Sequence, residues 1–318
     1  MRGEFDFIEN LRRRYDLAAV GDDCAVLPQS GDLDLVITAD LLVEDVDFRL
    51  EWTTPEMLGH KALAVSVSDI AAMGGLPKWS LTSIGVPEKL WNSEFIDRFY
   101  RGWHSIADAL DVVLIGGDVS RTPDRFVVDS VVGGNVPKGK AIPRSRAKPG
   151  DAIFVTGNLG GAAGGLQLLQ RGLRLDDCAD WQRRLIRRQL APLPRVAEGS
   201  SLRKNGTASA MIDMSDGLSS DLHHLCEASG VGAEIDAAAV PIDDDLQQLT
   251  ASREQQLDLA LNGGEDFELI FTVPEKKILA LDSEHFFRIG TVTANVGIVE
   301  LRTESETRIL RPSGYRHF

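Results

Sequence analysis

Cysteine is scarce in this sequence, with three residues in 318, at positions 24, 178 and 226. The number is odd and the positions are scattered without a C-x-x-C pair, so the pattern does not indicate a disulfide framework. We interpret Cys24, Cys178 and Cys226 as small core residues of a protein in a reducing compartment.

Long apolar runs are also absent. No stretch approaches the roughly 20 residues that a helix needs to cross a bilayer. The first residues, MRGEFDFIENLRRRYD, contain no apolar segment typical of a secretory leader. We therefore expect a cytoplasmic protein with no membrane partner.

Positive charge is in deficit. Lys and Arg total 34 against 48 Asp and Glu, which gives a formal net charge of -14. Such a surface repels a phosphate backbone unless a basic stripe or metal ions intervene, so we expect no nucleic-acid partner.

The common nucleotide-binding motifs are missing. The sequence has no G-x-x-x-x-G-K-[ST] loop, no protein-kinase signature and no G-x-G-x-x-G after a strand. A nucleotide site would have to be built in another way.

The composition that remains is that of a globular protein, with 43% hydrophobic and 26% charged residues over a length that suggests about two domains. Short β-branched runs predict strands at 33–39, 80–87, 112–115 and 125–134, and helical patterns cover 55–73 and 93–110. In the second half we expect strands at 151–157, 209–214 and 268–273, with helices at about 158–172, 179–190, from 194, 218–229 and 245–261. This alternation predicts an α/β fold.

The best linker candidate is PKGKAIPRSRAKPGD, residues 137–151, which is rich in Pro, Gly and basic residues and has no apolar periodicity. We therefore predict two domains, 1–138 and 139–318.

Seven aspartates fall where a charge needs a partner. Asp40, Asp118, Asp213 and Asp216 close predicted strands, Asp22 and Asp23 precede an apolar run, and Asp69 lies inside the apolar helical stretch ALAVSVSDIAAMGG. A single acid at a strand end is commonly a helix cap or a turn former. No Lys or Arg lies within these segments, so a Mg²⁺ cluster is the simplest common partner for all seven.

Three further segments each leave two interpretations open. Ser215, Asp216 and Gly217 stand where a strand becomes a helix, so the N–H groups there can hold phosphate oxygens, or Ser215 is a plain N-cap. TGNLGGAAGGL, residues 156–166, is a weak phosphate signal, and its glycines equally permit close helix packing. Glu265 and Asp266 form either a solvated turn or part of a site. We interpret His223 and His224 as structural.

Taken together, nine motifs in order along the chain resemble the thiamine-monophosphate kinase family, of the aminoimidazole ribonucleotide synthetase-like superfamily. They are GDDCAVL, TADLLVEDVDF, KALAVSVSDIAAMGGLPKW, IGGDVSR, AKPGDAIFVTG, RQLAPLPR, MIDMSDGLSSDL, NGGEDFELIFTV and GYRHF. The likeness runs from Gly3 to Phe318 and is highly specific as a set.

The resemblance implies an N-terminal α/β domain that pairs with its twin in a homodimer, a C-terminal α/β domain, and ATP bound through several Mg²⁺ ions. The residues that the family motifs make metal ligands are Asp23, Thr38, Asp40, Asp69, Asp118, Asp213 and Asp216. The implied ATP contacts are Tyr100, Gly117, Asp118, Arg144 and Ser215, and the implied substrate contacts are Asp47, Glu265 and Tyr315.

The sequence departs from the family pattern at three places. Asp47 stands where the family usually has a substrate-contacting His, and an acid there would favour a thiazolium cation but repel the acceptor phosphate. Ala39 replaces a Thr beside the metal Asp, so only its backbone carbonyl could ligate. Gly161 and Ala162 replace an Asp-Ser pair in the Gly-rich turn.

The implied reaction is in-line transfer of the γ-phosphoryl group of ATP to thiamine monophosphate, the last step of thiamine diphosphate biosynthesis. The acceptor phosphate has a second pKa of about 6 and is largely ionised near pH 7, so no general base and no catalytic side chain are expected. Metal ions would let two anions meet. Two alternatives stay open: another ATP-dependent member of the superfamily, and an inactive protein that binds ATP and Mg²⁺.

Overall fold

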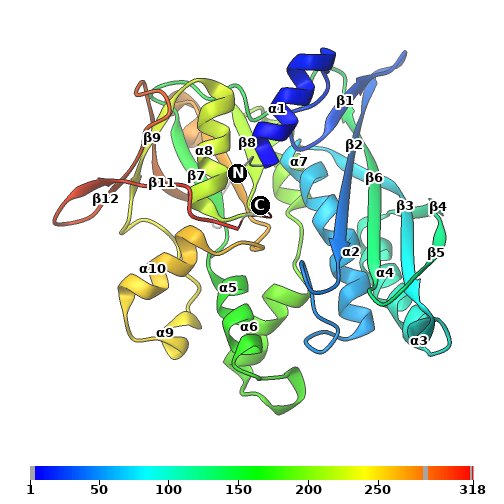
Figure 1. The fold of residues 1–318 in the computed structure, drawn as a ribbon. Helices are drawn as coiled ribbons and strands as arrows, with labels where there is room; N and C mark the ends of the chain where they lie inside the picture. Colours follow the sequence, from blue (N-terminus) through cyan, green and yellow to red (C-terminus); the bar gives the residue numbers. More distant parts are fainter. Residues whose placement is uncertain (1–3, 282–285, 316, 318) are drawn as a thin grey trace.

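The computed structural model describes residues 4–281, 286–315 and 317. Gly3, where the likeness to the family begins, and Arg316 and Phe318 of the motif GYRHF lie outside the described residues. Figure 1 shows the first half of the chain, in blue and cyan, on one side of the molecule, and the second half, in green to red, on the other. Each half is built around its own sheet.

The first sheet has the strand order β1-β2-β6-β3-β4, with β5 paired to β3. Its strands are β1 (Ala25–Pro28), β2 (Leu33–Val43), β3 (Leu76–Pro87), β4 (Val113–Gly116), β5 (Val119–Thr122) and β6 (Val127–Pro137). The accompanying helices are α1 (Glu4–Tyr15), α2 (Pro55–Ala72), α3 (Glu88–Trp91) and α4 (Phe95–Leu110). Even-numbered residues of β2 face α2, because side chains alternate along a strand.

Helix α2 is the central element of the molecule. Thr54 caps it by accepting a hydrogen bond from the Met57 N–H (3.2 Å), and Pro55 occupies its first turn. Two glycines let α2 and α4 pack backbone to backbone: a Cβ at Gly59 would lie 1.9 Å from the Phe99 carbonyl oxygen, and one at Gly102 would lie 1.8 Å from the Glu56 carbonyl oxygen. The helix is therefore buried nearly all round.

The second sheet has the order β13-β12-β9-β11-β7-β10-β8. Its strands are β7 (Ala152–Thr156), β8 (Ala210–Asp213), β9 (Gly232–Asp236), β10 (Leu269–Val273), β11 (Phe286–Thr293), β12 (Val299–Arg302) and β13 (Thr307–Ile309). The helices are α5 (Gly161–Gln170), α6 (Asp180–Leu190), α7 (Val196–Asn205), α8 (Leu218–Ser229), α9 (Leu246–Leu249) and α10 (Arg253–Asn262), with 3₁₀ turns η1 (Leu175–Asp177) and η2 (Glu275–Ala280). Within this sheet β12 pairs with β9 in parallel, and the other pairs are antiparallel.

The two halves meet along α2. Helix α7 of the second half packs on it so closely that a Cβ at Gly199 would lie 2.1 Å from the Ala71 carbonyl oxygen. Strand β8 also contacts α2. Residues 137–151 cross between the halves, and the predicted division into domains 1–138 and 139–318 stays a prediction.

The α/β prediction is confirmed, and the strands expected from β-branched runs are present to within a few residues. One expected helix is wrong: residues 245–261 form two helices, because Thr250 is extended (φ -150°, ψ 136°) and Ser252 caps a new start by accepting from the Gln255 N–H (3.3 Å). The three cysteines are free thiols; Cys24 and Cys226 are buried as predicted, whereas Cys178 is only partly buried. Among the described residues no helix is both long and apolar enough to cross a membrane.

Candidate active site

Four aspartates from both halves of the chain form an acidic cluster, which we define as Asp23, Asp40, Asp69 and Asp213. Asp23 precedes β1, Asp40 lies on the α2-facing side of β2, Asp69 lies on α2, and Asp213 ends β8. Carboxylate oxygens of Asp23, Asp69 and Asp213 lie within 4.8 Å of one another. Asp40 is close enough to raise the pKa of Asp69 and of Asp213 by charge repulsion.

Hydroxyl groups orient the carboxylates of the cluster. The Thr38 hydroxyl donates to Asp69 Oδ2 (2.5 Å), which ties β2 to α2. The Ser68 hydroxyl donates to Asp213 Oδ2 (2.6 Å), which ties α2 to β8. The second bond joins the two halves of the chain directly at the cluster.

The electrostatics of the cluster are unfavourable for the protein alone. Burial raises the pKa of Asp23 to about 8, against the attraction of Arg144 and with repulsion from Asp213 adding to it. Burial raises the pKa of Asp213 to about 6, against the Ser68 hydrogen bond. The pKa of Asp40 and that of Asp69 are also raised, in both cases mainly by burial. Four carboxyl groups in one small volume need more positive charge than they have.

Arg144, from the crossing segment, brings one cation to the cluster. Its Nη2 donates to Asp23 Oδ1 (2.7 Å), and its backbone N–H donates to Asp22 Oδ1 (3.2 Å). The Asp22 and Asp23 side chains are 19% and 2% exposed, so these are largely buried pairs. The sequence showed no cation within the acidic segments because Arg144 is distant from them along the chain.

The donor atoms of the cluster suit a hard cation. Asp23 Oδ2 and Asp40 Oδ2 are buried and have no hydrogen-bond partner within the described part of the chain. Buried polar atoms rarely stay unsatisfied, and carboxylate and hydroxyl oxygens are the ligands that Mg²⁺ prefers. The residues present therefore fit the expected magnesium site.

The turn between β8 and α8 differs from the expectation of open N–H groups. The backbone N–H groups of Asp216 and Gly217 both donate to Asp221 Oδ2 (3.1 and 2.9 Å), so a side chain of α8 already takes them. Gly217, not Ser215, is the N-cap residue. Asp216, Asp221 and His224 bring potential ligand atoms within 4.8 Å of one another.

Beside the cluster lies a cavity of about 790 Å³. Asp40, Ser215 and Asp216 line it at the end next to the cluster, so the cavity and the cluster are continuous. The aromatic side chains that line it are Phe48, Trp52, Phe267 and Tyr315. A mostly apolar wall with a few charged groups at defined points is typical of a small-molecule site.

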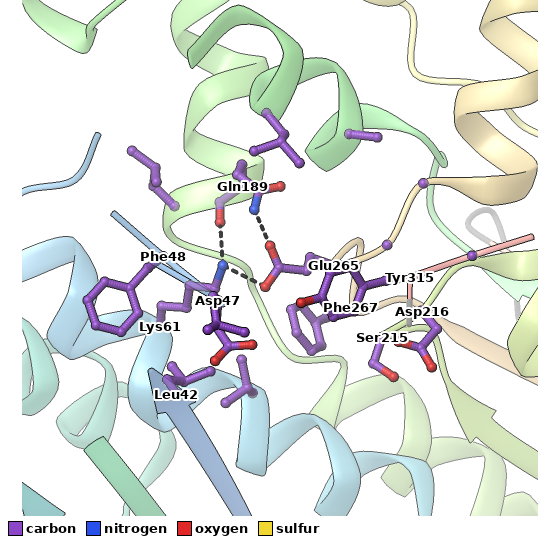
Figure 2. A pocket seen from close by; sticks show the side chains of 18 of the residues that line it. Leu42, Asp47, Phe48, Lys61, Gln189, Ser215, Asp216, Glu265, Phe267 and Tyr315 are labelled. Atoms are coloured by element: carbon purple, nitrogen blue, oxygen red, sulfur yellow. Dashed lines mark hydrogen bonds and ion pairs between the residues drawn. The ribbon is translucent and has the colours of Figure 1, made fainter. Parts of the chain in front are cut away.

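The three predicted substrate contacts line this cavity together (Figure 2). The Asp47 carboxylate accepts from the Val43 N–H (2.8 Å), which fixes its direction. The pKa of Tyr315 is raised by burial and then by Asp47, Glu265 and Asp216, so these carboxylates face the phenol.

Sequence reasoning missed Lys61 and Gln189. Both line the cavity, and Lys61 forms an ion pair with Glu265 (Nζ to Oε1, 2.6 Å). A lysine in an otherwise apolar helical stretch is the signal that could have identified it.

The structure does not bring every predicted ligand together in one chain. Asp118 is exposed between β4 and β5, and β6 and β3 separate β5 from the Asp40 strand. Three strand spacings are about 14 Å, too far for one ion to bind both carboxylates. Gly117 and the half-buried Tyr100 of α4 are also not among the residues that line the cavity. A Cβ added at Gly117 would lie 1.9 Å from the Thr82 carbonyl oxygen.

The Gly-rich turn at 156–166 has a structural role. The N–H groups of Gly160 and Ala162 donate to Asp266 (2.5 and 3.0 Å), and a Cβ at Gly165 would lie 2.1 Å from the Leu185 carbonyl oxygen. Close helix packing is thus the correct interpretation. Asp266 is 9% exposed, so the acidic pair at 265–266 is not a solvated turn.

Comparison with known proteins gives the same picture over the whole chain. Residues 21–136 match the model of the AIR synthase related protein N-terminal domain, and residues 148–301 match that of its C-terminal domain. The chain is 39% identical to a thiamine-monophosphate kinase of Bacillus subtilis (strain 168), covering 99% of both chains, and 41% identical to one of Escherichia coli (strain K12), covering 99% of this chain and 95% of the other. A solved structure described as AaThiL complexed with AMPPCP and TMP superposes with a TM-score of 0.87 at 32% identity, covering 99% and 97% of the two chains.

Proposed function

Because this chain belongs to the thiamine-monophosphate kinase family, we propose that it transfers the γ-phosphoryl group of ATP to thiamine monophosphate, giving thiamine diphosphate and ADP. The observation that carries this proposal is the continuity between the acidic cluster and a cavity with aromatic and acidic walls. A relative of this fold binds AMPPCP and TMP together, which supports a site for a nucleotide and a second ligand.

The four aspartates of the acidic cluster would hold magnesium together with Thr38 and Asp216. Asp118 would bind a separate ion. When bound, the ions supply the positive charge that lets two anionic reactants approach. The Thr38 and Ser68 hydroxyls hold Asp69 and Asp213 in fixed directions. The acceptor phosphate, with a second pKa of about 6, is already ionised near pH 7, so no side chain has to remove a proton.

The acidic side of the cavity supports a cationic acceptor. Asp47 and Glu265 place carboxylates around the space beside Tyr315, and a thiazolium ring carries the positive charge they would attract. Asp47 stands where the family usually has His, so this chain adds one negative charge there. The acceptor phosphate would lie toward Asp40, the cluster carboxylate that lines the cavity.

For ATP we propose contacts from Tyr100, Gly117, Asp118, Arg144 and Ser215. Arg144 already lies at the cluster, and Ser215 lines the cavity beside it. The distance of Asp118 from Asp40 suggests an extended nucleotide or a contribution to a second subunit's site.

A homodimer is supported by the uncovered face of the first sheet. By register, the strands expose these large apolar side chains on the face opposite α2: Leu27, Leu33, Leu41, Leu76 and Val113. Leu33 and Leu41 are eight residues apart on β2 and so share the face opposite α2. Exposed apolar area of this kind usually marks an interface. We also propose a cytoplasmic location, which the three free thiols support.

The test is formation of thiamine diphosphate from thiamine monophosphate with ATP and Mg²⁺. We expect equal amounts of ADP and thiamine diphosphate, and no product with EDTA. Release of ADP only with a different acceptor would assign the chain to another reaction of the superfamily, and ATP binding without turnover of any acceptor would contradict catalysis.

A further inference from the structure

Lys61 is a buried cation at the wall of the cavity. Its side chain is 3% exposed, and its Nζ lies 2.6 Å from Glu265 Oε1 and donates to the Gln189 carbonyl oxygen (3.3 Å). The Gln189 Nε2 donates to the other oxygen of Glu265. Figure 2 shows Lys61 and Gln189 meeting the Glu265 carboxylate, with Asp47 beside them. Lys61, Gln189 and Glu265 thus form a three-residue clamp from α2, α6 and the segment before β10.

The fold itself does not require a charge at this position. The neighbours of Lys61 along α2 are Ala62, Leu63 and Ala64, which belong to hydrophobic clusters. Burying an ammonium group is unfavourable, and an ion pair in such a place is often no more stable than well-packed apolar residues. The presence of a buried lysine here therefore points to what it does for Glu265.

Glu265 is held by its backbone as well as by its side chain. Its φ is +67°, in the left-handed region that side-chain-bearing residues rarely adopt, and Phe267 has φ +49°. The Glu265 N–H donates to the Ser215 carbonyl oxygen (2.8 Å), and the Phe267 N–H donates to that of Met214 (2.9 Å). Such strained backbone persists where the surrounding structure fixes a side chain for a purpose.

The clamp still leaves Glu265 able to bind a ligand. A carboxylate offers about four lone-pair positions, and the clamp uses one on each oxygen. The Glu265 side chain is 26% exposed and lines the cavity, so the remaining positions are open to it. Without Lys61, the Glu265 carboxylate would lose its ion-pair partner and keep only the hydrogen bond from Gln189.

We propose that Lys61, with Gln189, is a positioning residue that fixes the ionised carboxylate of Glu265 toward the cationic ring of the acceptor, and so sets the preference of the site for a positively charged acceptor. This inference rests on the proposed function. Lys61 acts through Glu265 and does not contact the acceptor itself.

The experiment compares four proteins: wild type, Lys61→Met, Glu265→Gln and the double variant. Wild type is assayed first, and absence of thiamine diphosphate there overturns the proposed function. With wild type active, we expect Lys61→Met to raise KM for thiamine monophosphate at least about tenfold, as removal of one partner of a buried charge pair does. KM for ATP should change by less than about twofold. Lys78→Met, which breaks the exposed Lys78–Asp111 pair (2.9 Å), is the matched control and should leave both constants unchanged.

The double variant separates positioning from direct contact. It replaces the buried ion pair with two neutral side chains of similar shape, so it leaves no unpaired charge and should fold even if Lys61→Met does not. We expect its KM for thiamine monophosphate to equal that of Glu265→Gln within about twofold. Three outcomes would overturn the inference. In the first, the rise in KM for the double variant is the product of the rises for the two single variants. In the second, Lys61→Met leaves KM for thiamine monophosphate unchanged, and in the third it raises both KM values equally and lowers Tm.

Discussion

At the scale of single residues, the site depends on carboxylates that the protein alone does not neutralise. Asp23 and Asp40 each keep a buried oxygen without a hydrogen bond inside the described chain, and burial raises the pKa of both. Glu268, a buried acid outside the cluster, is satisfied instead, since it accepts from Thr156, Arg188 and Arg195. This difference supports the proposal that the cluster binds a cation, whereas Glu268 belongs to an internal ion-pair network.

The first prediction concerns Asp40→Asn. Loss of one ligand charge should lower kcat by on the order of 100-fold or more, since metal stabilisation of a phosphoryl transfer is worth several kcal/mol. The Tm of the metal-free protein should not fall, because a neutral amide costs less to bury than this carboxylate. Both are measured by product formation and thermal unfolding, with the exposed Asp124→Asn as control. Full activity of Asp40→Asn would contradict the metal assignment.

The second prediction is a pH dependence of the metal-free protein. The folded-state pKa values of Asp23 (about 8) and Asp213 (about 6) lie above the ordinary value of 3.8. Between pH 3.8 and about 8, the folded protein therefore binds more protons than the unfolded chain. Stability contributed by these two groups is therefore lost as pH rises from 3.8 to about 8. In EDTA the Tm should be several degrees lower at about pH 8 than at about pH 5.5, and Mg²⁺ should reduce the difference. A metal-free Tm that rises over this range would refute it.

Residue types and motif order were enough to predict that Asp23, Asp40, Asp69 and Asp213 share one place, because each is an acid in an apolar setting. Lys61 was not predicted, since its partners are 128 and 204 residues away along the chain. The capping of the β8–α8 turn by Asp221 was also missed, because that contact depends on how α8 begins.

At the scale of elements, α2 carries both Asp69 of the cluster and Lys61 of the clamp, and its position is set by close backbone packing. Most of the longer helices and strands were predicted because their apolar periodicity is strong, whereas α1 and α3 were not predicted. Strands β1, β5, β9 and β11–β13 were not, since they are short or mix charged with apolar residues, and pairing across the sheet defines them.

The third prediction tests this packing with Gly59→Ala. The added Cβ would lie 1.9 Å from the Phe99 carbonyl oxygen, so α2 and α4 must move apart. We expect the free energy of unfolding to fall by about 1–3 kcal/mol. Gly31→Ala is the control, with nothing within 4 Å of the new Cβ. Equal unfolding midpoints for the two variants would show that the interhelical contact is not tight.

At the scale of the whole molecule, the two halves are joined at several places along and just after α2. Ser68 bonds Asp213, Lys61 bonds Glu265, and the Arg203 Nε donates to the Gly74 carbonyl oxygen (2.6 Å). On the opposite face of the first sheet, several large apolar side chains are exposed within the described part of the chain. One face of this sheet therefore builds the site, and the other is available for a second subunit.

The fourth prediction is that Val113→Asp breaks the proposed homodimer. Val113 is 59% exposed on β4, its register places it on the face opposite α2, and a charge there would be buried without a partner in the dimer. Analytical ultracentrifugation should give a dimer for wild type and a monomer for the variant. Val296→Asp, at a site 66% exposed outside the first sheet, should remain dimeric. A monomeric wild type, or a dimeric Val113→Asp, would rule out this interface.

The hydrogen bond from Ser68 to Asp213 also has a meaning during translation. A nascent chain that has left the ribosome as far as residue 150 carries Asp23, Asp40 and Asp69, but lacks the fourth acid and the strand that holds it. Under the proposed function, the ions would therefore bind only after β8 has been made, because a chain cut short before β8 lacks the carboxylate of Asp213.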